Sequence, residues 1–102
     1  LAVYDATRQF PKEEQFGLTS QLRRATVSVA SNIVEGCARS SPADYLRFLD
    51  MAFGSIREVE YQISIASRLG YFSPDVASKL AQQADETARV LAGLLRSLCT
   101  QT

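Results

Sequence analysis

The sequence contains no histidine, no tryptophan and only two cysteines among its 102 residues. Without histidine, the Ser-His-Asp and Cys-His catalytic arrangements, a Cys/His zinc site and the Glu-x-x-His pairs of di-iron bundles are all impossible. Cys37 and Cys99 lie far apart with no Cys-x-x-Cys spacing. Two such cysteines are typical of free thiols in a reducing cytoplasm. We therefore expect a cytoplasmic protein that is not an enzyme and has no metal site and no cofactor.

An excess of charge is also absent, because 11 Lys and Arg balance 11 Asp and Glu. This balance argues against strong non-specific nucleic-acid binding, which normally needs a basic surplus. Most of the basic residues are arginine, which is the better ligand for phosphates and bases. Genomic codon usage is the plainer explanation of that bias, and it stays open.

Long apolar runs are missing as well. No run approaches the roughly 20 residues that a membrane span needs, and no signal segment opens the chain, so we expect no membrane partner. The chain begins at Leu1 with neither a methionine nor a helix-start signal. We therefore expect further residues upstream and a first helix that is cut at its start.

Proline and glycine are few, and they divide the chain into helices. Ser41-Pro42 and Ser73-Pro74 each combine a good N-cap with a residue favoured at the first helical position. Gly70 is typical of a position just past a helix end. These marks define four segments: Leu1 to about Gln9, about Leu18 to about Arg39, Pro42 to Leu69, and Pro74 to about Leu98.

Apolar residues recur at steps of three and four in each long segment, which predicts amphipathic helices, and no segment shows the alternation of a strand. Short connections favour antiparallel neighbours. We therefore predict one all-α domain over residues 1–102, an antiparallel up-down four-helix bundle. The expected core includes Leu22, Val29, Leu49, Ile56, Leu80 and Leu91.

The second and third segments carry more apolar residues than one stripe needs. The extra residues are Val27, Ala30 and Val34 in the second, and Tyr45, Phe48 and Ala52 in the third. Since the outer face of a helix in a monomeric bundle is normally polar, the surplus indicates a subunit interface. A wide core stripe on central helices explains the same pattern, and both interpretations stay open.

A polar row interrupts the second segment. Arg24, Ser28 and Asn32 follow at steps of four, with Glu35 and then Gly36 beyond them, so the side chains form one ridge of a helix. The third segment offers a matching set in Ser55, Glu58 and Gln62.

Three interpretations compete for this row: a solvated face, a structural polar network, and a ligand or nucleic-acid surface. An acid/base pair of Glu35 with Glu58 is a very weak further idea. We favour a network that holds helices in register. Arg24 would be buried in it, paired with Glu58, with Glu60 or with a carboxylate of another subunit.

The stretches FPKEEQFGLTSQLRRATVSVASNIVEG and YLRFLDMAFGSIREVE resemble a bacterial family of small four-helix bundle proteins. Some members of that family are encoded in intervening sequences of large-subunit ribosomal RNA genes. The resemblance extends to LGYFS and LLRSL near the C-terminus. It rests on Arg24, Ser28, Asn32, the Glu35-Gly36 pair, Ser55 and Glu58 in combination. The family often has glycine where this chain has Ala38, and its first helix is longer.

The resemblance implies a left-handed antiparallel bundle without enzymatic activity that forms a ring-like homo-oligomer, a pentamer. A related accessory protein of diversity-generating retroelements is a pentamer that binds nucleic acid and a reverse transcriptase. The leading hypothesis is therefore an oligomeric assembly or adaptor protein.

The alternative is an RNA- or DNA-binding accessory factor that uses arginines repeated by symmetry, with Arg23, Arg39 and Arg47 as the candidate contacts. A third and weaker idea is a bundle that binds a small ligand or a metal through carboxylates.

Overall fold

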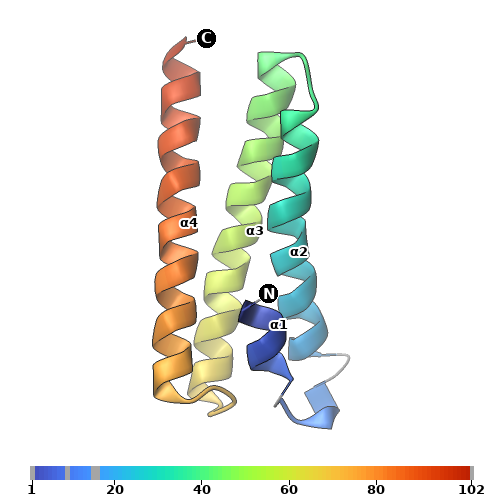
Figure 1. The fold of residues 1–102 in the computed structure, drawn as a ribbon, viewed down its shortest axis with the longest axis vertical. Coiled ribbons are helices and arrows are strands. Elements are labelled where there is room, and N and C mark those ends of the chain that lie inside the picture. The colour runs from blue at the N-terminus through green and yellow to red at the C-terminus, as the bar shows by residue number, and fades with distance from the viewer. Residues whose placement is uncertain (1, 9, 15–16, 102) are drawn as a thin grey trace.

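The computed structural model describes residues 2–8, 10–14 and 17–101, with side chains up to Leu98. In this part of the chain every regular element is a helix, and three long helices pack antiparallel beside a short one (Figure 1). The predicted all-α bundle is confirmed. The elements are α1 (Ala2–Thr7), the 3-10 turn η1 (Lys12–Glu14), α2 (Leu18–Cys37), α3 (Pro42–Arg68) and α4 (Pro74–Gln101).

Both predicted Ser-Pro helix starts are confirmed. Ser41 has extended backbone angles, and its Oγ accepts a hydrogen bond from the Asp44 N–H at 3.4 Å. The Ser73 Oγ accepts one from the Val76 N–H at 3.2 Å. These caps satisfy amide groups that the first turn of a helix leaves free. Gly70 follows α3 with φ of +76°, a left-handed conformation in which glycine avoids steric strain.

The helix ends differ from the expected ones by a few residues. Helix α2 ends at Cys37 rather than near Arg39, because its last turn tightens: the Ala38 N–H donates to both the Val34 and the Glu35 carbonyl oxygens. Helix α4 continues to Gln101 instead of ending near Leu98, since no glycine or proline follows to stop it.

Helix α3 lies between the other two long helices and supplies the centre of the core. Leu49, Ala52 and Ala66 on α3 are at most 1% exposed, and Leu22 on α2 is fully buried. Ala52 is therefore a core residue, and the wide-stripe interpretation holds for this position. No Cα atom of α2 lies within 8 Å of a described Cα atom of α4.

A groove separates α2 from α4. At one end the six-residue helix α1 fills it and contacts both neighbours (Figure 1). Beyond α1 two adjoining cavities of about 280 and 440 Å³ continue along the groove, and both are lined by Ile33 of α2 and Thr87 of α4. Helix α3 forms the floor with Ile56 and Leu49. None of the described helices is both long enough and apolar enough to span a membrane.

Candidate functional site

The centre of the predicted polar row joins α2 to α3. The Ser28 and Ser55 hydroxyl oxygens lie 2.8 Å apart, in hydrogen-bond contact. The Asn32 amide nitrogen donates to the Ser28 carbonyl oxygen at 2.9 Å and to the Ser28 Oγ at 3.1 Å. A hydroxyl has one proton and two acceptor lone pairs, so the Ser28 Oγ can accept from Asn32 while either serine donates to the other. All three side chains are half-buried, so their polar atoms satisfy one another inside the helix contact.

The matching polar set on α3 includes a second hydrogen bond, further along that helix. The Gln62 Nε2 donates to the Glu58 Oε1 at 3.3 Å. Gln62 is only 5% exposed, and its Oε1 is buried without a hydrogen-bond partner among the described residues. We call Ser28, Asn32, Ser55, Glu58 and Gln62 the polar seam. The hydrogen bonds of its side chains run mainly within this set and to the Ser28 carbonyl oxygen.

Arg24 lies outside the polar seam. Its side chain is exposed and donates to the Ser20 Oγ at 3.2 Å. Among the described residues it forms no ion pair with Glu58 or Glu60, and Glu60 instead pairs with Arg57 at 3.0 Å. The expectation that Arg24 is buried in the row is therefore wrong within one chain, because its helix position turns it away from α3.

Glu35 and Gly36 end the row in different ways. Glu35 is exposed and accepts a hydrogen bond from Arg39 at 3.0 Å. It lies far from Glu58: since Ser55 faces Ser28, Glu58 is level with the turn around Ala25, roughly 15 Å along α2. The two carboxylates therefore cannot form an acid/base pair.

Gly36 permits a close approach of α2 to α3. It is buried, and a Cβ atom there would lie 3.1 Å from both the Phe48 Cβ and the Tyr45 Cδ1. These distances are tighter than ordinary van der Waals contacts. The glycine of the motif thus has a packing role.

Arg23, a predicted nucleic-acid contact, instead attaches α1 to α2. Its Nε donates to the Thr7 Oγ1 at 2.8 Å, and its guanidinium lies 4.8 Å from the centre of the Tyr4 ring. Thr7 is 2% exposed. Because its Nε, one terminal nitrogen and one face of the guanidinium are already engaged, Arg23 is the least available of the three candidates.

Arg39 and Arg47 come together at the turn between α2 and α3. Each guanidinium carbon lies 5.0 Å from the centre of the Phe48 ring. Arg39 pairs with Glu35 at 3.0 Å and Arg47 with Asp44 at 3.9 Å. The sequence predicted both arginines as candidates, but it gave no sign that one aromatic ring holds them. Their carboxylate partners balance the local charge.

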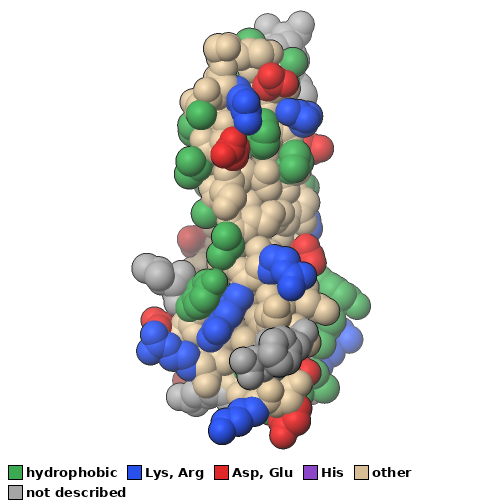
Figure 2. Space-filling model, turned by 90° about the vertical axis from the view of Figure 1, so that its right-hand side faces the viewer, with side chains coloured by type: hydrophobic (Ala, Val, Ile, Leu, Met, Phe, Trp, Pro, Cys, Tyr) green, Lys and Arg blue, Asp and Glu red, His purple; other side chains and the backbone are tan. Residues whose placement is uncertain are grey.

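The outward side of α2 is exposed and uncharged. Val27 is 47% and Val34 68% exposed, and Ala30 and Ser31 between them are exposed too. No charged residue occurs from Ala25 to Val34. Figure 2 views the molecule from the α2 side, and its middle shows green and tan between groups of charged side chains. We call Val27, Ala30, Ser31 and Val34 the α2 outer face.

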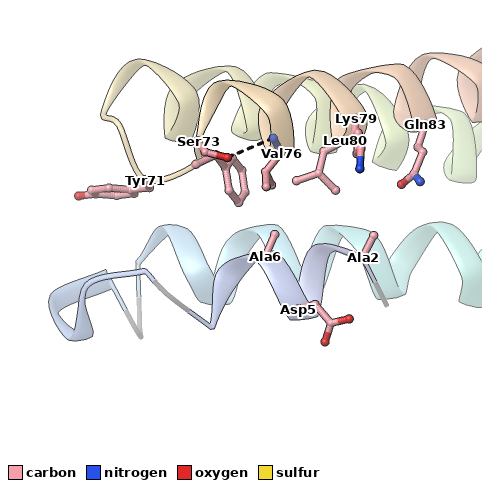
Figure 3. A pocket seen from close by; sticks show the side chains of 10 residues that line it. Ala2, Asp5, Ala6, Tyr71, Ser73, Val76, Lys79, Leu80 and Gln83 are labelled. Atoms are coloured by element: carbon pink, nitrogen blue, oxygen red, sulfur yellow. Dashed lines mark hydrogen bonds between the residues drawn. The ribbon is translucent and has the colours of Figure 1, made fainter.

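A further cavity of about 430 Å³ opens between α1 and the start of α4 (Figure 3). Its lining is mostly apolar, with Lys79 and Gln83 pointing toward α1, while Asp5 turns away from α4. Asp5 also pairs with Arg8 at 3.6 Å. No group of three or more potential metal ligands occurs among the residues with described side chains. The lining therefore lacks the converging polar groups expected of an active site.

Residues 1–93 match the model of the 23S rRNA-intervening sequence protein family. No curated protein matches the chain significantly. A crystal structure from Bacteroides thetaiotaomicron, of a protein with unknown function from the S23 ribosomal protein family, is similar with a TM-score of 0.83. The two share 21% sequence identity, over 92% of this chain and 87% of that chain. At this identity the likeness concerns the fold.

Proposed function

We propose that this chain, which belongs to the 23S rRNA-intervening sequence protein family, is a non-enzymatic assembly or adaptor protein that acts as a homo-oligomer. The α2 outer face carries the proposal. A helix that faces only water in a small bundle normally has a polar outer side. Here four adjacent exposed residues carry no charge, and two of them are valines.

A non-enzymatic role is supported by the chemistry of the side chains. The sequence has no histidine, which is the most common general acid or base. The carboxylates of the predicted row, Glu35 and Glu58, each bind the side chain four residues further along the chain. These groups stabilise local structure and are not directed into a common cavity.

The resemblance to the pentameric accessory protein of diversity-generating retroelements favours a ring of five copies. It also favours an adaptor role, in which the assembled protein contacts a nucleic acid or another protein. Some members of the family are encoded in intervening sequences of ribosomal RNA genes, and this location is consistent with an accessory role.

The test is the mass of the purified protein at micromolar concentration, by light scattering and sedimentation. We expect a multiple of the 11.2 kDa chain mass, fivefold for a single ring and tenfold for two joined rings. Replacing Val27 and Val34 together by Glu should lower the mass, because it places charges on the α2 outer face. Tyr61→Glu is the matched control, since Tyr61 on α3 is equally exposed at 67%. A mass near 11.2 kDa for the unaltered protein would refute the proposal.

Nucleic-acid binding is a second candidate, favoured by one observation. Arg39 and Arg47 are brought together over the Phe48 ring, and arginine planes and aromatic rings are both used to contact nucleic acids. Glu35 and Asp44 compensate these charges within one chain. Binding would therefore depend on several copies that align their arginines.

A further inference from the structure

We infer that the α2 outer face is self-complementary and that α2 of one copy packs antiparallel against α2 of a second copy. The inference rests on the proposed homo-oligomer, and it names the surface and the arrangement of the partner. A contact of this kind is closed by a two-fold axis. Such a contact cannot close a ring of five, so within the proposed assembly it pairs copies that belong to two different rings.

The apolar part of the contact is a narrow stripe. Val27 and Val34 are seven residues apart, which places them on one side of the helix. Ala30 and Ser31 lie between them, and all four side chains are exposed. Small residues between larger apolar ones allow two helix backbones to approach closely, with the valines of one helix filling the spaces beside the small residues of the other.

Opposite charges flank the stripe on the same edge. Arg24 precedes the stripe and Glu35 follows it. The two residues are eleven positions apart, which is three helical turns to within about 20°, so they lie on the same side of α2. In an antiparallel pair related by a two-fold axis, each edge faces the same edge of the partner. Arg24 of each copy then faces Glu35 of the other copy. In a parallel pair the two Arg24 side chains would lie at the same level instead.

Both side chains are available for such a contact. Arg24 is exposed, and its described partner is the Ser20 hydroxyl at 3.2 Å. Glu35 pairs with Arg39, but 56% of its side chain remains exposed. A carboxylate can accept several hydrogen bonds, so Glu35 can bind Arg24 of the partner without releasing Arg39.

The positions of these residues favour a second copy over an unrelated partner. The apolar pair and the charged pair have nearly the same centre in the sequence. Both the midpoint of Val27 and Val34 and that of Arg24 and Glu35 fall between residues 29 and 31. One two-fold axis near Ala30 therefore matches the apolar pair and the charged pair at once. An unrelated partner would place no such symmetry requirement on the sequence.

A charge-reversal cycle tests the arrangement. Arg24→Glu and Glu35→Arg are made singly and together, and the dissociation constant for self-association is measured by sedimentation equilibrium at low salt. Each single change replaces two attractive pairs by two repulsive ones, so we expect it to raise the dissociation constant roughly tenfold. The double variant restores the attraction with exchanged signs and should return to within about threefold. Arg89→Glu is the control, because it breaks an exposed pair with Asp85 on α4.

The possible results separate this inference from the proposed function. An oligomeric parent whose single variants associate equally well overturns the α2 contact and leaves the homo-oligomer standing. Single variants that weaken association without recovery in the double variant overturn the antiparallel arrangement. A monomeric parent contradicts the proposed homo-oligomer itself.

A cross-linking experiment gives an independent answer if a reversal variant does not fold. In a background without the native cysteines, Ser31→Cys places a thiol next to the expected axis. We expect rapid formation of a disulfide-linked dimer on mild oxidation. Ser64→Cys, at an exposed position of α3, is the control and should stay largely monomeric in denaturing gels. Equal rates for both variants would contradict the proposed contact.

Discussion

The hydrogen bond between Ser28 and Ser55 should stabilise the α2–α3 contact by about 1 kcal/mol. The two hydroxyl oxygens are 2.8 Å apart and half-buried. A neutral intramolecular hydrogen bond contributes about 0.5–1.5 kcal/mol net. Replacing either serine by alanine removes this bond, but it also gains a few tenths of a kcal/mol, because alanine is the better helix former. The single variants alone therefore underestimate the bond.

A double-mutant cycle removes that complication. Ser28→Ala, Ser55→Ala and the double variant are compared with the parent, and the propensity gains cancel in the coupling energy. We expect a coupling of about 1 kcal/mol, with the double variant losing little more than either single one. Asn32 still donates to the Ser28 carbonyl oxygen at 2.9 Å, so its amide is not left without a partner when Ser28 is truncated.

The assay is urea unfolding followed by far-UV circular dichroism, since the chain has no tryptophan. All variants are measured at one protein concentration, because self-association would add to the apparent stability. The control cycle uses Ser31 and Ser64, which are exposed on different helices and should show no coupling. A Ser28–Ser55 coupling energy within about 0.3 kcal/mol of zero would refute the view that the polar seam stabilises this contact.

The remaining predictions concern the core, the glycine, the arginines and one tyrosine. Leu49→Ala should lower the free energy of unfolding by about 2–5 kcal/mol. The control Tyr61→Ala changes an exposed side chain and should lower it by less than about 0.5 kcal/mol. Equal losses of unfolding free energy in urea melts would place Leu49 outside the core. Gly36→Leu should destabilise by about 1–3 kcal/mol, because its side chain would overlap two aromatic residues of α3, and an unchanged melting midpoint would contradict the close approach. If the assembled protein binds RNA or DNA, Arg47→Glu should weaken binding to all sequences alike. The affinity of the parent protein should fall roughly 10³-fold or more between 50 and 200 mM salt. A weak dependence of the affinity on salt would exclude a phosphate contact. Partial burial, followed by the charge of nearby glutamates, raises the pKa of Tyr71 above 10.0. The protonated Tyr71 side chain therefore stabilises the folded state below that pH, and this stabilisation is lost as the pH rises further. An absorbance titration in which Tyr71→Phe removes no tyrosine that titrates above the ordinary range would contradict this.

The helices themselves follow from local features of the sequence. The spacing of Leu18, Leu22 and Val29 predicts an amphipathic helix, and α2 has this helix with these residues buried. Ser41 and Ser73 predict the starts of α3 and α4, and their hydroxyls cap those helices. Such features are readable because helical hydrogen bonds and caps join residues only three or four positions apart.

The composition of the polar row was predictable only in part. The sequence placed Arg24, Ser28 and Asn32 on one ridge, and the structure keeps Ser28 and Asn32 in the contact with α3 but leaves Arg24 outside it. Helical spacing shows that side chains share a ridge. It does not show where along the width of that ridge the neighbouring helix makes contact, and four-residue steps drift by about 40° per turn.

What the sequence by itself determined is therefore the class of the protein: helices at defined positions, a bundle without histidine chemistry, and an uncharged stretch in α2. The tertiary structure decided the partners. It joined Ser28 to Ser55, attached Arg23 to Thr7 and brought Arg39 and Arg47 to one ring. It also left Val27 and Val34 exposed. Contacts between residues distant in the chain depend on how whole helices approach and rotate against each other, and no short stretch of sequence contains that information.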